Sequence, residues 1–291
     1  MPIPVTISAL YSYPVKSCAG ISHEQSLISQ AGLPFDRHWV IVDQAGAFMT
    51  QRTWPRMALI KPFLDPFHLT LNATSMPAIS VPLQLPVDTP VAVPVRIWQS
   101  DTIGFDQGNA VAQWLGDFLQ TPCRLLRVHP AAARIASPSH IDSWIDKNKN
   151  WASGFPARHE FAFADGFPLL IANQASLDEL NRQLEEKQQP AVPMNRFRPN
   201  IVLQGLEAYD EDYLLGMRLG ELTFAFVKPC ARCPIPNIDQ STAQMASEPG
   251  LTLAAHRSFK DGVLFGVNAV VTEPANAKVR VGDTVQAQFN L

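Results

Sequence analysis

The stretch Val227-Lys228-Pro229-Cys230-Ala231-Arg232-Cys233-Pro234-Ile235-Pro236 follows an alternating apolar run from Leu222 that predicts a β-strand. It carries two of the chain's four cysteines in a Cys-x-x-Cys spacing, with Arg232 between them. Its three prolines fix φ and remove backbone N–H groups, so we expect the strand pairing to end there and a rigid loop to follow. A cation beside a cysteine favours the thiolate, the form that binds metals and attacks electrophiles. The stretch therefore predicts a ligand or redox site.

Other interpretations of this cysteine pair remain open. Cysteine is often buried, so the two thiols can be core residues. A redox Cys-x-x-Cys normally opens a helix, which Pro234 and Pro236 oppose. A four-thiolate zinc site needs a second close pair, but Cys18 and Cys123 are isolated. A single thiolate that binds a softer cofactor metal also fits the pattern.

The composition is typical of a globular protein without nucleic-acid or membrane partners. The chain has 291 residues, of which 46% are hydrophobic and 17% charged, and its formal net charge is -3. The N-terminus lacks the features of a signal peptide, and no apolar run is long enough to span a bilayer. The scattered cysteines form no disulfide framework, which favours a reducing compartment. We therefore expect a cytoplasmic protein.

The order of apolar runs predicts a mostly β fold with some α. Between residues 57 and 95 short apolar runs are interrupted by prolines, which favours an antiparallel barrel or sandwich. Residues 109–119 have one apolar helical face, and a capping box at Ser176 predicts a helix to about Lys187. The polar segment 131–158 predicts a surface excursion or a lid over a site. The character of the chain changes near Trp98, so the predicted domains are 1–98 and 99–291.

Four short motifs occur in an order that resembles a known family. The first is Tyr13-Pro-Val-Lys-Ser-Cys-Ala-Gly20, and Asp36-Arg-His-Trp-Val40 follows about 20 residues later. Phe197-Arg-Pro-Asn-Ile-Val202 then precedes the Cys-x-Arg-Cys segment. Together they resemble the MOSC superfamily, and more narrowly the branch that holds the amidoxime-reducing component and its bacterial relatives. The resemblance runs from Tyr13 to about Val285.

This resemblance implies a fold, a cofactor and a set of site residues. The fold is an N-terminal β-barrel-like domain followed by a MOSC β-barrel domain with peripheral helices, and the cofactor is the molybdenum cofactor (molybdopterin). Cys233 would be the thiolate ligand of the metal, and Asp165 would approach the metal pocket as a second catalytic residue. The residues implied in binding the cofactor's phosphate and pterin are Lys16, Ser17, Arg37, Arg198 and Asn200. Arginine and lysine suit a phosphate group, and a thiolate suits a metal already bound by sulfur.

The resemblance also implies an activity with a small-molecule substrate. The protein would reduce N-hydroxylated compounds and receive electrons from a ferredoxin-, flavodoxin- or cytochrome b5-like protein and its reductase. One alternative is a cofactor carrier or sulfur-transfer module in which Cys233 bears a persulfide, and another is a purely structural MOSC domain. Residues Asp239 to Ala243 depart from the family's Asp-Pro-x-Thr-Gly, and Ala231 and Gly166-Phe167 also depart, so hydrogen bonds to the cofactor are in doubt.

Overall fold

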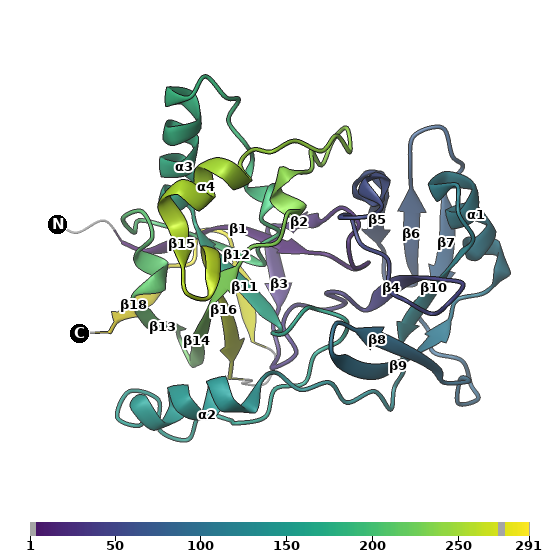
Figure 1. The fold of residues 1–291 in the computed structure, drawn as a ribbon. Helices are drawn as coiled ribbons and strands as arrows, with labels where there is room; N and C mark the ends of the chain where they lie inside the picture. Colours follow the sequence, from purple (N-terminus) through teal and green to yellow (C-terminus); the bar gives the residue numbers. More distant parts are fainter. Residues whose placement is uncertain (1–3, 273–276, 291) are drawn as a thin grey trace.

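The protein has two lobes that lie side by side (Figure 1). The structure, a computed structural model, describes residues 4–272 and 277–290. The larger sheet, in the first lobe, has the order β18-β13-β14-β16-β11-β12-β1-β2, and β15 pairs with β16. Its strands are β1 (Thr6–Ser12), β2 (Ile21–His23), β11 (Leu169–Asn173), β12 (Ile201–Gln204), β13 (Leu214–Leu219), β14 (Leu222–Ala231), β15 (Ser258–Phe259), β16 (Gly262–Val271) and β18 (Gln286–Phe289). All neighbours are antiparallel except β11 and β12.

The second lobe holds a four-stranded and a three-stranded sheet. The four-stranded sheet has the order β4-β10-β9-β8, and β6 is central in the other sheet, between β5 and β7. The predicted helix α1 (Asn109–Leu119) buries Trp114 and Leu115 in the core of this lobe together with Trp39 and Ile41. The strands are β4 (Trp39–Asp43), β5 (Lys61–Leu64), β6 (His68–Asn72), β7 (Ile79–Pro82), β8 (Val93–Ile97), β9 (Ser100–Asp106) and β10 (Cys123–Val128). The mostly β prediction is thus confirmed.

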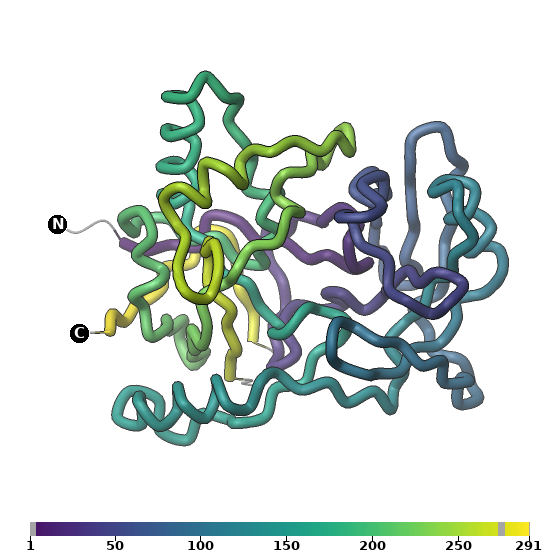
Figure 2. The backbone as a smooth tube through the Cα atoms, in the orientation of Figure 1, coloured from purple at the N-terminus to yellow at the C-terminus, as the bar shows by residue number. Residues whose placement is uncertain are grey.

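The chain passes between the lobes more than once. Both ends of the described chain lie in the first lobe, where β1 and β2 belong to the larger sheet (Figure 2). The chain then builds the second lobe up to β10 and returns to form β11. A small sheet of β3 (Gln25–Leu27) and β17 (Lys278–Arg280) joins distant parts of the chain. The boundary predicted at residues 98/99 falls in the turn between β8 and β9, where Ile97 pairs with Ser100.

Three further helices lie around the larger sheet: α2 (Pro138–Lys147), α3 (Gln174–Glu186) and α4 (Gly250–Arg257). Helix α2 lies within the polar segment 131–158, for which no helix was predicted. Helix α3 begins two residues before the predicted capping box, because the Asn173 side chain accepts the backbone N–H of Ala175. Ser176 instead lies inside the helix and donates its hydroxyl to Glu211. No helix formed by the described residues is long and apolar enough to cross a membrane.

The prediction that strand pairing stops before the cysteines was wrong. Strand β14 continues to Ala231 and pairs with β16 through Pro229, which lies opposite Val267. Beyond Ala225 its partner strand within the described part of the chain is β16 alone, and two register shifts let the chain accommodate the proline. The strand therefore carries Cys230 directly to the junction of the lobes.

Candidate cofactor-binding site

A cavity of about 300 Å³ lies where the two lobes meet. It is lined by segments from both lobes, including the end of β14 and the loops before β4 and β11. The structure brings all seven predicted site residues to its wall: Lys16, Ser17, Arg37, Asp165, Arg198, Asn200 and Cys233. The wall carries five cationic side chains against one carboxylate. Such a cavity favours an anionic ligand.

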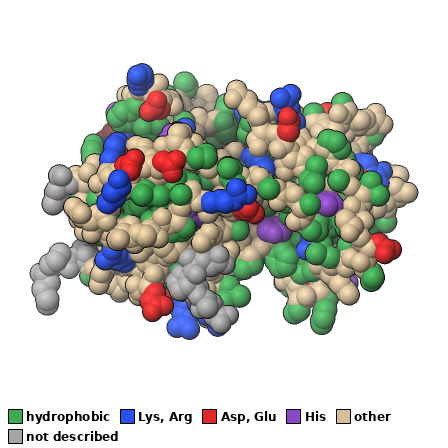
Figure 3. Space-filling view, turned by 90° about the horizontal axis from the view of Figure 1, so that it is seen from below, with side chains coloured by type: hydrophobic (Ala, Val, Ile, Leu, Met, Phe, Trp, Pro, Cys, Tyr) green, Lys and Arg blue, Asp and Glu red, His purple; other side chains and the backbone are tan. Residues whose placement is uncertain are grey.

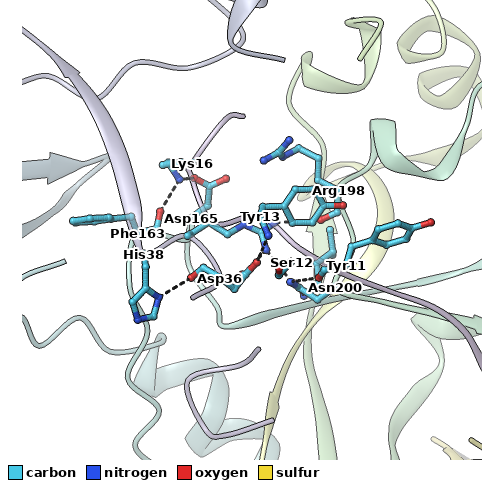
Figure 4. Close-up of polar contacts among 12 residues, drawn as sticks. Tyr11, Ser12, Tyr13, Lys16, Asp36, His38, Phe163, Asp165, Arg198 and Asn200 are labelled. Carbon is cyan, nitrogen blue, oxygen red and sulfur yellow. Dashed lines mark hydrogen bonds and ion pairs between the residues drawn. The ribbon is translucent and has the colours of Figure 1, made fainter. Parts of the chain in front are cut away.

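Two arginines of the cavity stack on one buried tyrosine. The guanidinium carbons of Arg37 and Arg198 lie 4.4 and 4.2 Å from the centre of the Tyr13 ring, and Figure 4 shows Arg198 against this ring. Arg198 also donates to the carbonyl of Cys18 at 2.6 Å. Burial lowers the pKa of Arg198 to about 10, so it keeps its charge at neutral pH. Both arginines have a left-handed backbone (φ 50° and 56°), which only a well-determined loop maintains.

Arg37 is held in place by a buried acid and a buried amide. Its Nη1 donates to Asp36 Oδ2 at 2.5 Å and to Asn200 Oδ1 at 3.1 Å. Asp36 also accepts the backbone N–H of Tyr13 at 2.8 Å, as Figure 4 shows. The Asn200 amide bonds the backbone of Leu170 and Tyr11 as well. In this structure Asn200 thus orients Arg37 and joins strands, in addition to lining the cavity.

Lys16 and Asp165 form an ion pair at the cavity wall. Lys16 Nζ lies 2.5 Å from Asp165 Oδ1 and donates to the carbonyl of Phe163 at 2.9 Å. Burial lowers the pKa of Lys16, and the charge of Asp165 opposes that shift. The surrounding protein alone would raise the pKa of Asp165, but the charge of Lys16 and hydrogen bonds from Lys16 and Trp98 hold it well below its usual range. The Asp165 side chain is 68% exposed because it faces the open cavity, and it is ionised at neutral pH.

The two thiols at the end of β14 differ in their surroundings. Both line the cavity and both are partly buried. Arg232 donates to Cys230 Sγ at 3.1 Å and to the carbonyl of Phe197 at 2.8 Å. Among the described residues, Cys233 has no hydrogen-bond partner for its sulfur. A thiol that faces the cavity without such a partner is free to become a metal ligand.

The altered loop after Cys233 is anchored to the second lobe. Gln240 stands where the family has proline, and its amide pairs reciprocally with that of Gln51 at 3.0 and 3.1 Å. Gln51 is fully buried and also donates to the carbonyl of Ser17 at 2.8 Å. Asp239 Oδ2 accepts a hydrogen bond from Arg196 Nη2 at 2.7 Å. This loop therefore has its own hydrogen bonds in place of the family pattern.

Three further side chains shape the site and were missed by sequence reasoning. Buried Arg134 donates to the carbonyls of Ala162 and Ala164, both at 2.7 Å, and so holds the segment that ends at Asp165. Arg52 and Trp98 line the cavity. No motif marks Arg134, whereas an aromatic residue in a tight turn was a usable signal for Trp98.

The polar segment 131–158 does not cover the cavity. Within the described ranges, none of its residues lines the wall. Helix α2 instead packs on β14, and its Trp144 donates to the carbonyl of Leu215, on the neighbouring strand β13, at 2.8 Å. Trp151 packs beside Trp144, with ring centres 5.9 Å apart. These tryptophans are packing residues.

Two family models and several curated proteins match this chain and show the family to which it belongs. The model of the MOSC N-terminal beta barrel domain matches residues 4–122, and that of the MOSC domain matches residues 158–286. Human mitochondrial amidoxime-reducing component 1 is 33% identical, over 96% of this chain and 82% of that protein. Rat mitochondrial amidoxime reducing component 2 is 30% identical, over 96% of this chain and 82% of that protein. Human molybdenum cofactor sulfurase is 29% identical over 91% of this chain, which spans only 30% of that larger protein. The chain therefore belongs to the MOSC-domain family, in the group that includes the amidoxime-reducing components.

Proposed function

We propose that this protein is a molybdenum-cofactor-dependent reductase of N-hydroxylated compounds such as amidoximes, hydroxylamines and N-hydroxylated bases. The observation that carries the proposal is the meeting of Lys16, Arg37, Arg198 and Cys233 in one cavity. They come from four separate segments, so their convergence is a property of the fold. The names of the relatives agree with this chemistry.

The side chains of the cavity fit a ligand that carries a phosphate and a metal bound by sulfur. Lys16, Ser17 and Arg37 would bind the phosphate, and Arg198 would bind the pterin with support from Asn200. Cys233 would ligate the metal through its thiolate. Among the residues that the structure describes, no group of three or more His, Cys, Asp or Glu side chains is placed to hold a metal, at the cavity or elsewhere.

The reaction consumes two electrons and two protons and converts the N–OH group into N–H and water. When bound, the cofactor supplies a metal centre that can pass two electrons to the N–O bond. Asp165, ionised at neutral pH, would accept a hydrogen bond from the substrate's N–H or O–H group and orient it. The electrons would come from a ferredoxin-, flavodoxin- or cytochrome b5-like protein and its reductase. The cytoplasmic location stays a prediction, since the amidoxime-reducing relatives are mitochondrial by name.

The test is the molybdenum content of protein purified from a host that makes the cofactor. We expect metal close to one atom per chain in the wild type and in Cys230→Ala, and almost none in Cys233→Ala. Cys230 is the matched control because it lines the same cavity on the same strand end. Loaded wild type should then reduce benzamidoxime with an artificial electron donor. Loaded protein that leaves benzamidoxime and N-hydroxycytosine unreduced would refute the substrate class.

A second candidate function is a carrier of the cofactor or of sulfur. It is favoured by two thiols on one cavity wall and by the likeness to a molybdenum cofactor sulfurase. In this case Cys233 would carry a persulfide. Intact-protein mass spectrometry would show an added sulfur atom that a reducing agent removes and that Cys233→Ala lacks.

A further inference from the structure

Trp98 occupies a backbone position that disfavours a large side chain. It is the first residue of the two-residue turn between β8 and β9, and its φ is 55°. Glycine, asparagine and aspartate are the usual residues at such positions, and an aromatic residue there is strained. The side chain is nevertheless 44% exposed, so core packing does not explain it. Strained, exposed aromatic residues of this kind suggest a functional contact.

The indole of Trp98 lies at the edge of the cavity. Its Nε1 donates to Asp165 Oδ1 at 2.7 Å, and its ring is nearly perpendicular to that of Phe48, with the ring centres 5.0 Å apart. Trp98 and Asp165 also line an adjoining recess of about 520 Å³. The indole is therefore shared by the cavity and by the recess next to it, where the rest of a bound substrate would extend.

Arg52 adds a positive charge at this edge. Its guanidinium carbon lies 4.1 Å from the centre of the Trp98 ring. The other four cations of the cavity each donate to an acceptor at 3.2 Å or less. Arg52, in contrast, has neither a hydrogen-bond nor an ion-pair partner within residues 4–272 and 277–290. A guanidinium stacked on a ring keeps its in-plane N–H groups available for a carboxylate.

We propose that Arg52 and Trp98 form a substrate subsite for planar aromatic compounds that carry a carboxylate. Trp98 would contact the aromatic ring and Arg52 would bind the carboxylate, while the N-hydroxylated group points toward Asp165 and Cys233. The negative charge of Asp165 does not forbid this, because Lys16 compensates it at 2.5 Å. The reaction at this substrate rests on the function proposed above, but the binding of the carboxylate does not.

The test compares benzamidoxime with 4-carboxybenzamidoxime on molybdenum-loaded protein. We expect the carboxylate to lower KM roughly tenfold in the wild type, because a charge-assisted hydrogen bond is stronger than a neutral one. Arg52→Gln should abolish this difference in KM between the two compounds. Arg56→Gln is the matched control: Arg56 is exposed on the same segment and stacks on Phe118, away from the cavity. Trp98→Ala should raise KM for both compounds.

Calorimetric binding of benzamidine and 4-carboxybenzamidine to the same proteins separates this inference from the proposed reaction. If neither amidoxime is reduced but 4-carboxybenzamidine binds roughly tenfold tighter in an Arg52-dependent way, the subsite stands and the reaction fails. If both amidoximes are reduced with equal KM and Arg52→Gln changes no binding, the reaction stands and the subsite is overturned. A loss of molybdenum from Arg52→Gln would also overturn it, since Arg52 would then serve the cofactor.

Discussion

A groove in the second lobe and the candidate site between the lobes differ in their charged and thiol side chains as well as in volume. A groove of about 950 Å³ lies beside helix α1 in the second lobe, roughly three times the volume of the cavity between the lobes. Its charged residues are three acids and one arginine, and each acid is committed to a neighbour. The cavity gathers five cations, two thiols and one acid from both lobes. Volume alone would favour the groove as the candidate cofactor site, whereas the cations and thiols of the wall favour the cavity between the lobes.

The face seen in Figure 3 supports the same distinction. There, acidic and basic side chains lie singly or next to each other, and no large area of one sign stands out. The cations of the cavity are therefore a local concentration and do not reflect the chain as a whole, whose formal net charge is -3. Local concentration of charge by the fold is what makes the cavity selective for anions.

The comparison is tested most strongly by one acid that supports an arginine of the cavity wall, Asp36, and one acid that lines the groove, Asp106. Asp36 is 5% exposed and holds Arg37 and the Tyr13 backbone, so Asp36→Asn leaves a buried charge unpaired. We expect a loss of about 3–5 kcal/mol in the free energy of unfolding. Asp106→Asn in the groove breaks a pair whose side chains are 30% and 43% exposed, and should cost about 0–1 kcal/mol. Urea denaturation of both variants measures this, and equal losses would contradict the distinction.

A buried acid that lies in neither the cavity nor the groove, Glu211, shows how burial shifts the pKa of a carboxyl group whose hydrogen-bond partner is a neutral hydroxyl. Glu211 is 1% exposed and its partner is the Ser176 hydroxyl, at 2.8 Å. Burial raises the pKa of Glu211 to about 7. Its contribution to stability is therefore fully present below its unfolded pKa of about 4.3 and is lost as the pH rises through 7. As the pH rises from about 4.3 to about 7, we expect the free energy of unfolding to decrease by up to about 3 kcal/mol.

Glu211→Gln should flatten the pH dependence of unfolding in this window, and exposed Glu185→Gln should leave it unchanged. Urea titrations at pH 5, 6, 7 and 8 give the measurement. Identical profiles for the wild type and Glu211→Gln would show that Glu211 is ionised in the folded protein.

The sequence predicts which residues meet at the cavity better than it predicts the contacts that hold them there, for a physical reason. Lys16, Arg37, Arg198 and Cys233 lie in short local motifs, and the structure brings them to one cavity. Their supports act over long sequence distances. Arg134 bonds backbone carbonyls about 30 residues away.

Strand boundaries failed for the same reason. Strand β14 continues through Pro229 because β16 pairs with it and because, among residues 4–272 and 277–290, no strand pairs with its other edge there. Neither condition can be recognised from the residues around the proline. Helix α3 begins at an Asn173 cap that competes with an equally plausible signal at Ser176, and the buried Glu211 occupies the serine. Local signals were thus overridden by tertiary partners.

The smallest expected effect concerns the amide pair that joins the lobes at the cavity. Gln51 and Gln240 exchange two hydrogen bonds, and Gln51 also supports the carbonyl of Ser17. We expect Gln240→Ala to lower the free energy of unfolding by about 0.5–1.5 kcal/mol. Gln51→Ala should cost more, because it also leaves the Ser17 carbonyl unpaired. The two changes should couple by at least about 0.5 kcal/mol in a double-mutant cycle.

The matched control for this pair lies in the groove. Gln113 donates to Asp117 one helical turn away on α1, at an exposed position. Gln113→Ala should change stability by no more than about 0.5 kcal/mol, because water replaces the lost partner. If Gln51→Ala and Gln240→Ala are additive, the amide pair does not join the lobes energetically. Coupling together with reduced molybdenum retention would show that the altered loop after Cys233 supports the cavity through its contact with the second lobe. Proline, the family's residue at position 240, has no side-chain amide and could not make this contact.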